Sequence, residues 1–121
     1  MNFVKFLNEL FPGWTRAPIG LVNKALAAHG PIVILFHDRG LKTLRGLRTL
    51  VKITNKTSKT HTIGVPPISM EKYYEDRGQK LDHPEYRLIY STIEPEHLYP
   101  PEIVRIESRV KIRVKPIDAS S

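Results

Sequence analysis

Apolar and charged residues alternate strictly near the end of the chain, over residues 103–115. The apolar positions of this alternation are Val104, Ile106, Val110, Ile112 and Val114, with Ser108 between them. The opposite positions are Arg105, Glu107, Arg109, Lys111, Arg113 and Lys115. Successive side chains of a strand point to opposite faces, so a period of two predicts one long strand. Its apolar face needs a core, and its other face is a row of mainly basic side chains about 6.8 Å apart.

Helical spacing predicts three short helices. Apolar residues recur every three or four positions over residues 2–10, and Pro12-Gly13 ends that helix. A second helix is expected over residues 18–29, with a proline in its first turn and Gly30 as its C-terminal cap. Ser69 can cap a third helix that closes at Gly78.

Short runs rich in β-branched and aromatic residues predict further strands. Proline, glycine and polar clusters bound these runs. The expected strands cover residues 32–36, 49–54, 62–65 and 86–92. In the last of them Tyr86, Leu88 and Tyr90 are expected to share one face.

A leucine every third residue marks the stretch from Leu41 to Leu50, which also contains Gly46. A spacing of three drifts by about 60° per step around an α-helix, so the leucines cannot form one narrow apolar stripe. The pattern favours a helix of only two turns, followed by the strand at residues 49–54.

These elements predict an α+β fold: a small mixed or antiparallel sheet of about four to five strands with two to four short helices. At 121 residues the chain suits one core. We expect residues 1–116 to form a single basic domain and residues 117–121 a short tail.

Composition removes several classes of protein. The chain has no cysteine, which excludes disulfides and thiolate metal sites. Its longest apolar run has the length of a strand, so we expect no membrane span. No targeting signal is evident at the start, and an intracellular reducing compartment is slightly favoured.

The formal net charge is +7, and it is unevenly distributed. Residues 39–60 contain seven basic side chains and no acidic one, residues 71–107 are rich in acids, and residues 109–115 are basic again. Segregated charge of this kind predicts a basic face. A nucleic-acid backbone is a fitting partner, because several lysines and arginines can match its regularly spaced phosphates.

The candidate nucleic-acid-binding residues are the members of the two basic clusters. They are Arg39, Lys42, Arg45, Arg48, Lys52, Lys56, Lys59, Arg105, Arg109, Lys111, Arg113 and Lys115. We expect three of the first cluster (Arg45, Arg48, Lys52) and three of the second (Arg109, Lys111, Arg113) to form one continuous surface. The other interpretation is that these long side chains only keep a sheet face solvated.

An enzyme has little support in the sequence. The segment Asp82-His83-Pro84-Glu85 could hold a divalent metal in a nuclease, but its spacing matches no ligand pattern and suits a polar loop equally. His37-Asp38 could be an acid-base pair, although such residues more often form a turn. Phosphate-binding and nucleophile motifs are absent. We predict no catalytic residue, no metal and no cofactor.

The favoured function is a non-enzymatic nucleic-acid-binding protein. RNA is favoured over DNA as the ligand, in a ribonucleoprotein assembly. The alternative is a structural or assembly protein, of viral or oligomeric scaffold type, whose basic face meets an acidic protein or another anionic surface. Its partner could be a second copy, since residues 71–107 supply acidic side chains.

Overall fold

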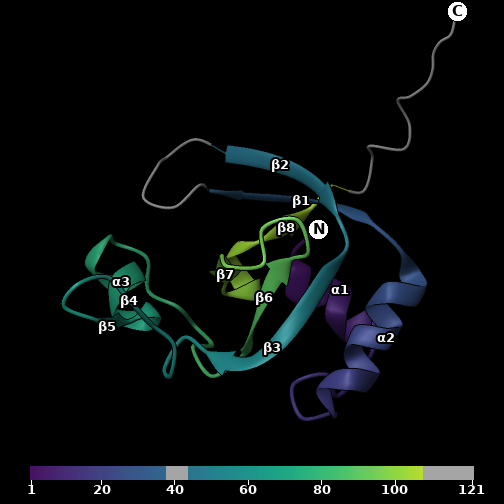
Figure 1. The fold of residues 1–121 in the computed structure, drawn as a ribbon, viewed down its shortest axis with the longest axis horizontal. Coiled ribbons are helices and arrows are strands. Elements are labelled where there is room, and N and C mark those ends of the chain that lie inside the picture. Colours follow the sequence, from purple (N-terminus) through teal and green to yellow (C-terminus); the bar gives the residue numbers. More distant parts are fainter. Residues whose placement is uncertain (38–43, 108–121) are drawn as a thin grey trace, which may run out of the picture.

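The computed structural model of the chain describes residues 1–37 and 44–107, and these residues form an α+β fold (Figure 1). The predicted fold class is confirmed, with three α-helices in the described ranges. The expected strands are divided among three small antiparallel sheets, ordered β2-β1-β8, β3-β6-β7 and β4-β5. Residues 38–43 and 108–121 lie outside the described ranges. They include the predicted tail, most of the predicted C-terminal strand, and the basic candidates Arg39, Lys42, Arg109, Lys111, Arg113 and Lys115.

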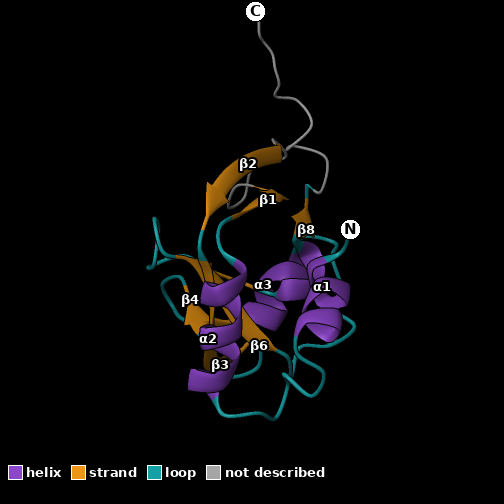
Figure 2. Cartoon of the chain, turned by 90° about the vertical axis from the view of Figure 1, so that its right-hand side faces the viewer, coloured by secondary structure: helices purple, strands orange, loops and turns teal. Residues whose placement is uncertain are grey.

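Two helices cover one side of the molecule (Figure 2). Helix α1 (Phe3–Leu10) begins where the side chain of Asn2 accepts a hydrogen bond from the backbone of Val4. Helix α2 (Ile19–His29) ends at Gly30, whose φ of 93° is a conformation that glycine adopts without strain. Both helices lie close to their predicted bounds because their apolar faces pack on the main core.

A long antiparallel hairpin forms the top of the molecule in Figure 1. Strand β1 (Ile32–His37) pairs with β2 (Leu44–Thr49) along its whole length. The two-turn helix expected before residue 49 is therefore wrong. The stretch also has a period of two, since residues 45, 47 and 49 point inward and residues 46 and 48 outward. Pairing of six residues with β1 then favours the strand over the helix.

The second sheet crosses below the hairpin. Strand β3 (Val51–Thr57) pairs with β6 (Arg87–Ser91), and β6 pairs with the short β7 (Leu98–Tyr99). The strand expected at residues 49–54 extends further along the chain, because β3 runs to Thr57. Strand β7 was not predicted, because it is short and lies between Pro95 and Pro100, and proline is unfavourable within a strand.

A small unit projects from this sheet, on the left in Figure 1. It consists of β4 (Thr62–Ile63), β5 (Ile68–Ser69) and helix α3 (Met70–Asp76). Ser69 caps α3 as predicted, with its hydroxyl accepting from the backbone of Lys72. Backbone hydrogen bonds from Met70 to His61 and from Glu71 to Ser58 tie α3 to the end of β3.

The start of the predicted C-terminal strand is different from the expectation. A 3-10 helix η1 (Pro101–Ile103) precedes β8 (Arg105–Ile106), because two successive prolines favour that turn. Strand β8 lies between β1 and the N-terminal segment, with Phe3 donating to the carbonyl of Val104. Val104 and Ile106 are buried as predicted.

The main core lies between the two helices and the inner faces of the two larger sheets. Its buried members include Phe3, Leu7, Trp14, Val22, Ile34, Phe36, Ile53, Ile89 and Val104. A second, smaller cluster of Met70, Leu88 and Leu98 joins α3 to the opposite side of sheet β3-β6-β7. No helix in the described ranges is long and apolar enough to cross a membrane.

Candidate nucleic-acid interface

The predicted basic residues that the structure describes do not share one surface. Arg45 points to the inner side of the hairpin, where its guanidinium forms an ion pair of 3.2 Å with Glu94 and lies 5.3 Å from the centre of the Phe36 ring. Its side chain is 33% exposed. Arg45 is therefore engaged by an acid and does not continue the surface of Arg48.

Arg48 and Arg105 share the outer face of sheet β2-β1-β8. Arg48 lies opposite Val33 and Arg105 opposite Leu35, and directly opposed residues in antiparallel strands point to the same side. Both arginines are exposed. Strand spacings place their Cα atoms about 12 Å apart. Sequence positions 57 residues apart are thus neighbours, while the cations of the last segment lie outside the described ranges.

Lys52 lies on the second sheet, opposite Tyr90 of β6, which in turn lies opposite Leu98 of β7. These three residues share the side of the sheet that faces away from the main core, which we call the Lys52 face. Lys52 and Tyr90 are each partly exposed. A cation beside an aromatic ring on an accessible sheet is suited to a phosphate and a stacked base.

Helix α3 borders the Lys52 face with two further tyrosines. Tyr74 packs with Tyr90 against the small cluster around Met70. Tyr73 meets Tyr74 edge to face, and the Arg77 guanidinium lies 3.6 Å from the centre of the Tyr73 ring. This arrangement was not predicted, because its one sign in the sequence is the adjacent pair of tyrosines.

Tyr86 does not share a face with Tyr90, contrary to the prediction. It precedes β6 and packs on the main core, edge to face with the buried Trp14 and stacked at 4.4 Å on His83. Strand geometry begins only at Arg87, so the alternation did not extend to Tyr86.

Lys56 and Lys59 are exposed near the far end of β3. Lys59 lies close enough to Glu85 to contribute to lowering the pKa of that carboxyl. The larger causes are a hydrogen bond from the backbone of Glu85 itself and then the hydrogen bond and charge of His83. The negative charge of Glu85 therefore partly offsets the positive charge of Lys59.

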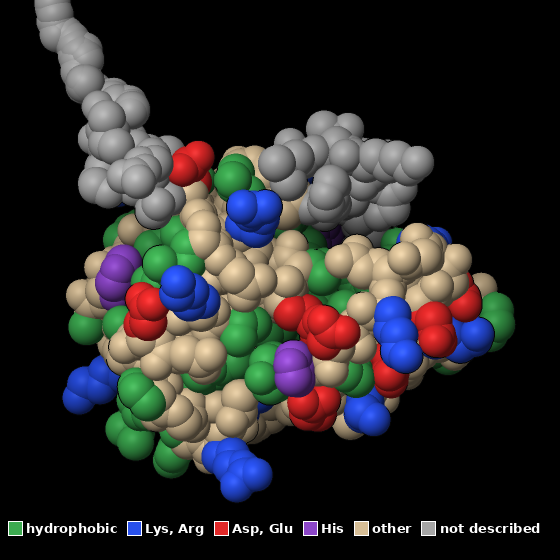
Figure 3. Space-filling model, turned by 180° about the vertical axis from the view of Figure 1, so that it is seen from behind, with side chains coloured by type: hydrophobic (Ala, Val, Ile, Leu, Met, Phe, Trp, Pro, Cys, Tyr) green, Lys and Arg blue, Asp and Glu red, His purple; other side chains and the backbone are tan. Residues whose placement is uncertain are grey.

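The segment 82–85 is held as a structural loop. The Glu102 carboxylate accepts hydrogen bonds of 2.8 Å from the backbone N–H groups of both Asp82 and His83. No group of three or more potential ligands in the described ranges is arranged to hold a metal ion. Seen from behind, acidic and basic side chains are interspersed over the coloured surface, which carries no single basic expanse (Figure 3).

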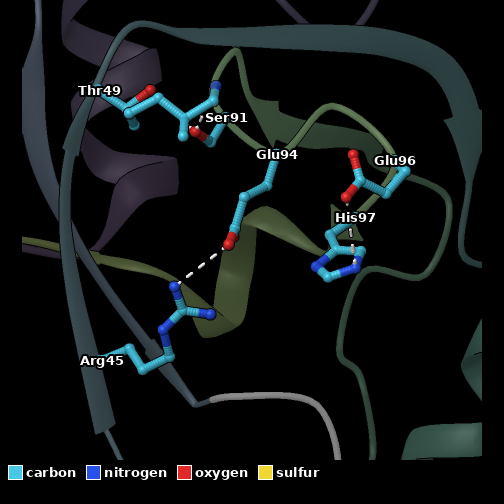
Figure 4. A network of polar contacts seen from close by, with 7 residues as sticks. Arg45, Thr49, Ser91, Glu94, Glu96 and His97 are labelled. Atoms are coloured by element: carbon cyan, nitrogen blue, oxygen red, sulfur yellow. Dashed lines mark hydrogen bonds and ion pairs between the residues drawn. The ribbon is translucent and has the colours of Figure 1, made fainter.

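A polar network joins β2 to the loop between β6 and β7 (Figure 4). Besides the Arg45–Glu94 pair it contains a buried hydrogen bond of 2.8 Å between the hydroxyls of Thr49 and Ser91. Within the same loop, Glu96 and His97 approach to 3.9 Å. Glu94 and His97 were not among the predicted site residues, because a proline-containing loop gave no sign that it folds back on β2.

Comparisons with known proteins find similarity at the level of the fold. No protein-family profile and no curated protein matches the sequence. Two solved structures of the Drosophila Argonaute 2 PAZ domain are similar to this chain in fold, each at 16% identity over 89% of it. One, described as the structural basis for 3′ end recognition of nucleic acids, has a TM-score of 0.61 and is covered to 94%. The other, described by its structure and nucleic acid binding, has a TM-score of 0.59 and is covered to 99%.

Proposed function

We propose that this protein binds nucleic acid through the Lys52 face and the adjoining tyrosines of α3. The observation that carries the proposal is the fold similarity, over almost the whole chain, to PAZ domains whose descriptions report nucleic-acid binding and 3′ end recognition. The net charge of +7 supports it, since such a charge attracts polyanions. The 3′ end of a strand is accordingly the first ligand feature to test.

The residues on the Lys52 face favour a single strand as the ligand. Tyr90 and Tyr74 are partly exposed and pack against the same small cluster, and unpaired bases can stack on such rings whatever their sequence. Lys52 supplies a positive charge beside Tyr90 for a phosphate. We infer a binding module that contains no catalytic centre of its own, with RNA preferred over DNA and a role within a ribonucleoprotein assembly.

Fluorescence anisotropy with labelled oligonucleotides tests this proposal. The ligands are a single-stranded RNA with a free 3′ hydroxyl, the same RNA circularised, the same sequence as DNA, and a blunt RNA duplex. We expect the linear RNA to bind most tightly, with log affinity falling by about 0.7 per phosphate contact for each unit of log salt. Equal affinity for linear and circular RNA would show that binding does not require a free 3′ end.

Absence of binding to every ligand at low salt would remove the proposed function. Sedimentation of the protein alone addresses the assembly alternative in that case. Self-association that weakens with salt would then indicate that the basic and acidic surfaces meet each other.

A further inference from the structure

The Arg45–Glu94 ion pair joins β2 to the loop between β6 and β7, in addition to the hydrogen bond between Thr49 and Ser91. Arg45 lies on β2 and Glu94 on the loop between β6 and β7, 49 residues later. The two side chains are 33% and 25% exposed, so the pair is within reach of solvent. The Phe36 ring beneath the guanidinium restricts where it can lie.

The carboxylate of Glu94 is only half satisfied. Its Oε2 accepts from Arg45, but its Oε1 is buried with no hydrogen-bond partner among the residues that the structure describes. The same holds for Nδ1 of His97 in that loop. A buried acceptor without a donor lowers the net gain from an ion pair. Glu94 is therefore a poorly satisfied ligand for Arg45.

We propose that Arg45 is a phosphate-binding position that Glu94 occupies when no nucleic acid is bound. The proposal rests on the function proposed above. A guanidinium offers its forked donors equally to carboxylate and to phosphate, so a phosphodiester group can take the place of Glu94. Release of Glu94 also frees its buried oxygen to be hydrated.

The loop is suitably placed for a ligand on the Lys52 face. Tyr90 and Leu98 of that face form the pair of β6 and β7 that lies nearest to the loop. Glu94 follows Tyr90 by four residues, at most about 14 Å along the chain. A strand of a few nucleotides stacked on Tyr90 can thus reach Arg45 with a neighbouring phosphate.

Neutralising Glu94 tests the proposal, because the proposal predicts that the variant binds RNA more tightly. Glu94→Gln keeps the shape of the side chain but weakens its hold on Arg45, so we expect single-stranded RNA to bind about two- to fivefold more tightly, as expected from the strength of an exposed ion pair. The dependence of log affinity on log salt should steepen by up to about 0.7, one additional phosphate contact. In an Arg45→Gln background the gain should vanish.

Glu96→Gln is the matched control. It makes the same change of charge two residues away, on a side chain whose ion pair within the described ranges is with His97 and not with Arg45. Equal gains from the two variants would mean that net charge alone matters and would overturn the proposal, as would a loss of affinity in folded Glu94→Gln. Thermal melts establish that each variant is folded.

The unaltered protein provides a second measurement. The ¹⁵N-labelled Arg45 Nε–H signal should shift as RNA is added, together with the backbone signals of Glu94. RNA binding that leaves these signals in place while those of Tyr90 move would overturn the Arg45 site and leave the proposed function intact. Absence of any RNA binding is the separate outcome that removes both.

Discussion

Asn23 takes the place of a neighbouring strand at the edge of β3. Its side-chain amide donates to the carbonyl of Ile53 at 3.2 Å, and its carbonyl accepts from the Ile53 N–H at 2.8 Å. Ile53 is almost completely buried, so both backbone groups depend on this one side chain. Helix α2 is fixed to the sheet in this way.

Asn23→Ala should therefore reduce the free energy of unfolding by about 1 to 3 kcal/mol, the cost of leaving buried backbone groups unpaired. Urea denaturation measures the loss. Asn55→Ala, on an exposed position of the same strand, should change stability by no more than about 0.5 kcal/mol. If the two variants lose the same amount, the contacts of Asn23 do not hold the strand edge.

Glu85 has a pKa below that of an ordinary glutamate, chiefly because its own backbone N–H donates to the carboxylate and secondarily because of His83. A lowered pKa means that the charged form is favoured in the folded state. Its contribution to stability is then present above the unfolded pKa and is lost as the pH falls through the folded value.

We expect a ¹³C titration of the Glu85 carboxyl to give a midpoint below that of the same group in an unfolded peptide. His83→Ala should move this midpoint upward without restoring it fully, because the backbone hydrogen bond remains. A midpoint at or above the peptide value would contradict the geometry of the loop.

The sequence predicted single elements best where the local signal was unambiguous. Helix α1 has a clear helical period and strand β1 is a run of β-branched and aromatic residues, and both lie where they were expected. Strand β2 was missed because its leucines at every third residue and its inward-outward alternation indicate different structures, and only pairing with β1 selects one. Strand β7 is two residues long, too short for any period to be visible.

The β4-β5-α3 unit is attached to the second sheet mainly by the small cluster of Met70, Leu88 and Leu98. Regions with few buried apolar contacts open more easily than a main core. Met70→Ala should thus speed amide exchange over residues 58–78 more than elsewhere, with a local loss of about 2 to 5 kcal/mol.

Hydrogen exchange measured by mass spectrometry resolves this effect. Leu26→Ala, in the main core, is the comparison and should speed exchange throughout the described ranges. Uniform acceleration by both substitutions would show that the unit and the main core unfold together.

At the scale of the molecule, the net charge predicted a class of partner but did not predict which surface would bind it. The twelve basic candidates are clustered in sequence, but their side chains depend on strand faces that no local pattern reveals. Arg48 and Arg105 were brought together across β1, Arg45 was turned inward to Glu94, and Lys52 was placed on a different sheet. Predicting the Lys52 face would have required the register of β3 with β6, which is a pairing between residues far apart in the sequence.

The central claim is that binding depends on the Lys52 face and follows from more than total charge. The most direct test compares the RNA affinity of two double variants. Lys52→Gln/Tyr90→Leu removes one charge and one stacking ring, whereas Arg48→Gln/Arg105→Gln removes two charges from the outer face of the other sheet. We predict a loss of at least about fivefold for the first, since stacking on an aromatic ring is worth about 1 to 3 kcal/mol per base, and a smaller loss for the second. A larger loss from the outer-face variant, with both proteins folded, would contradict the account.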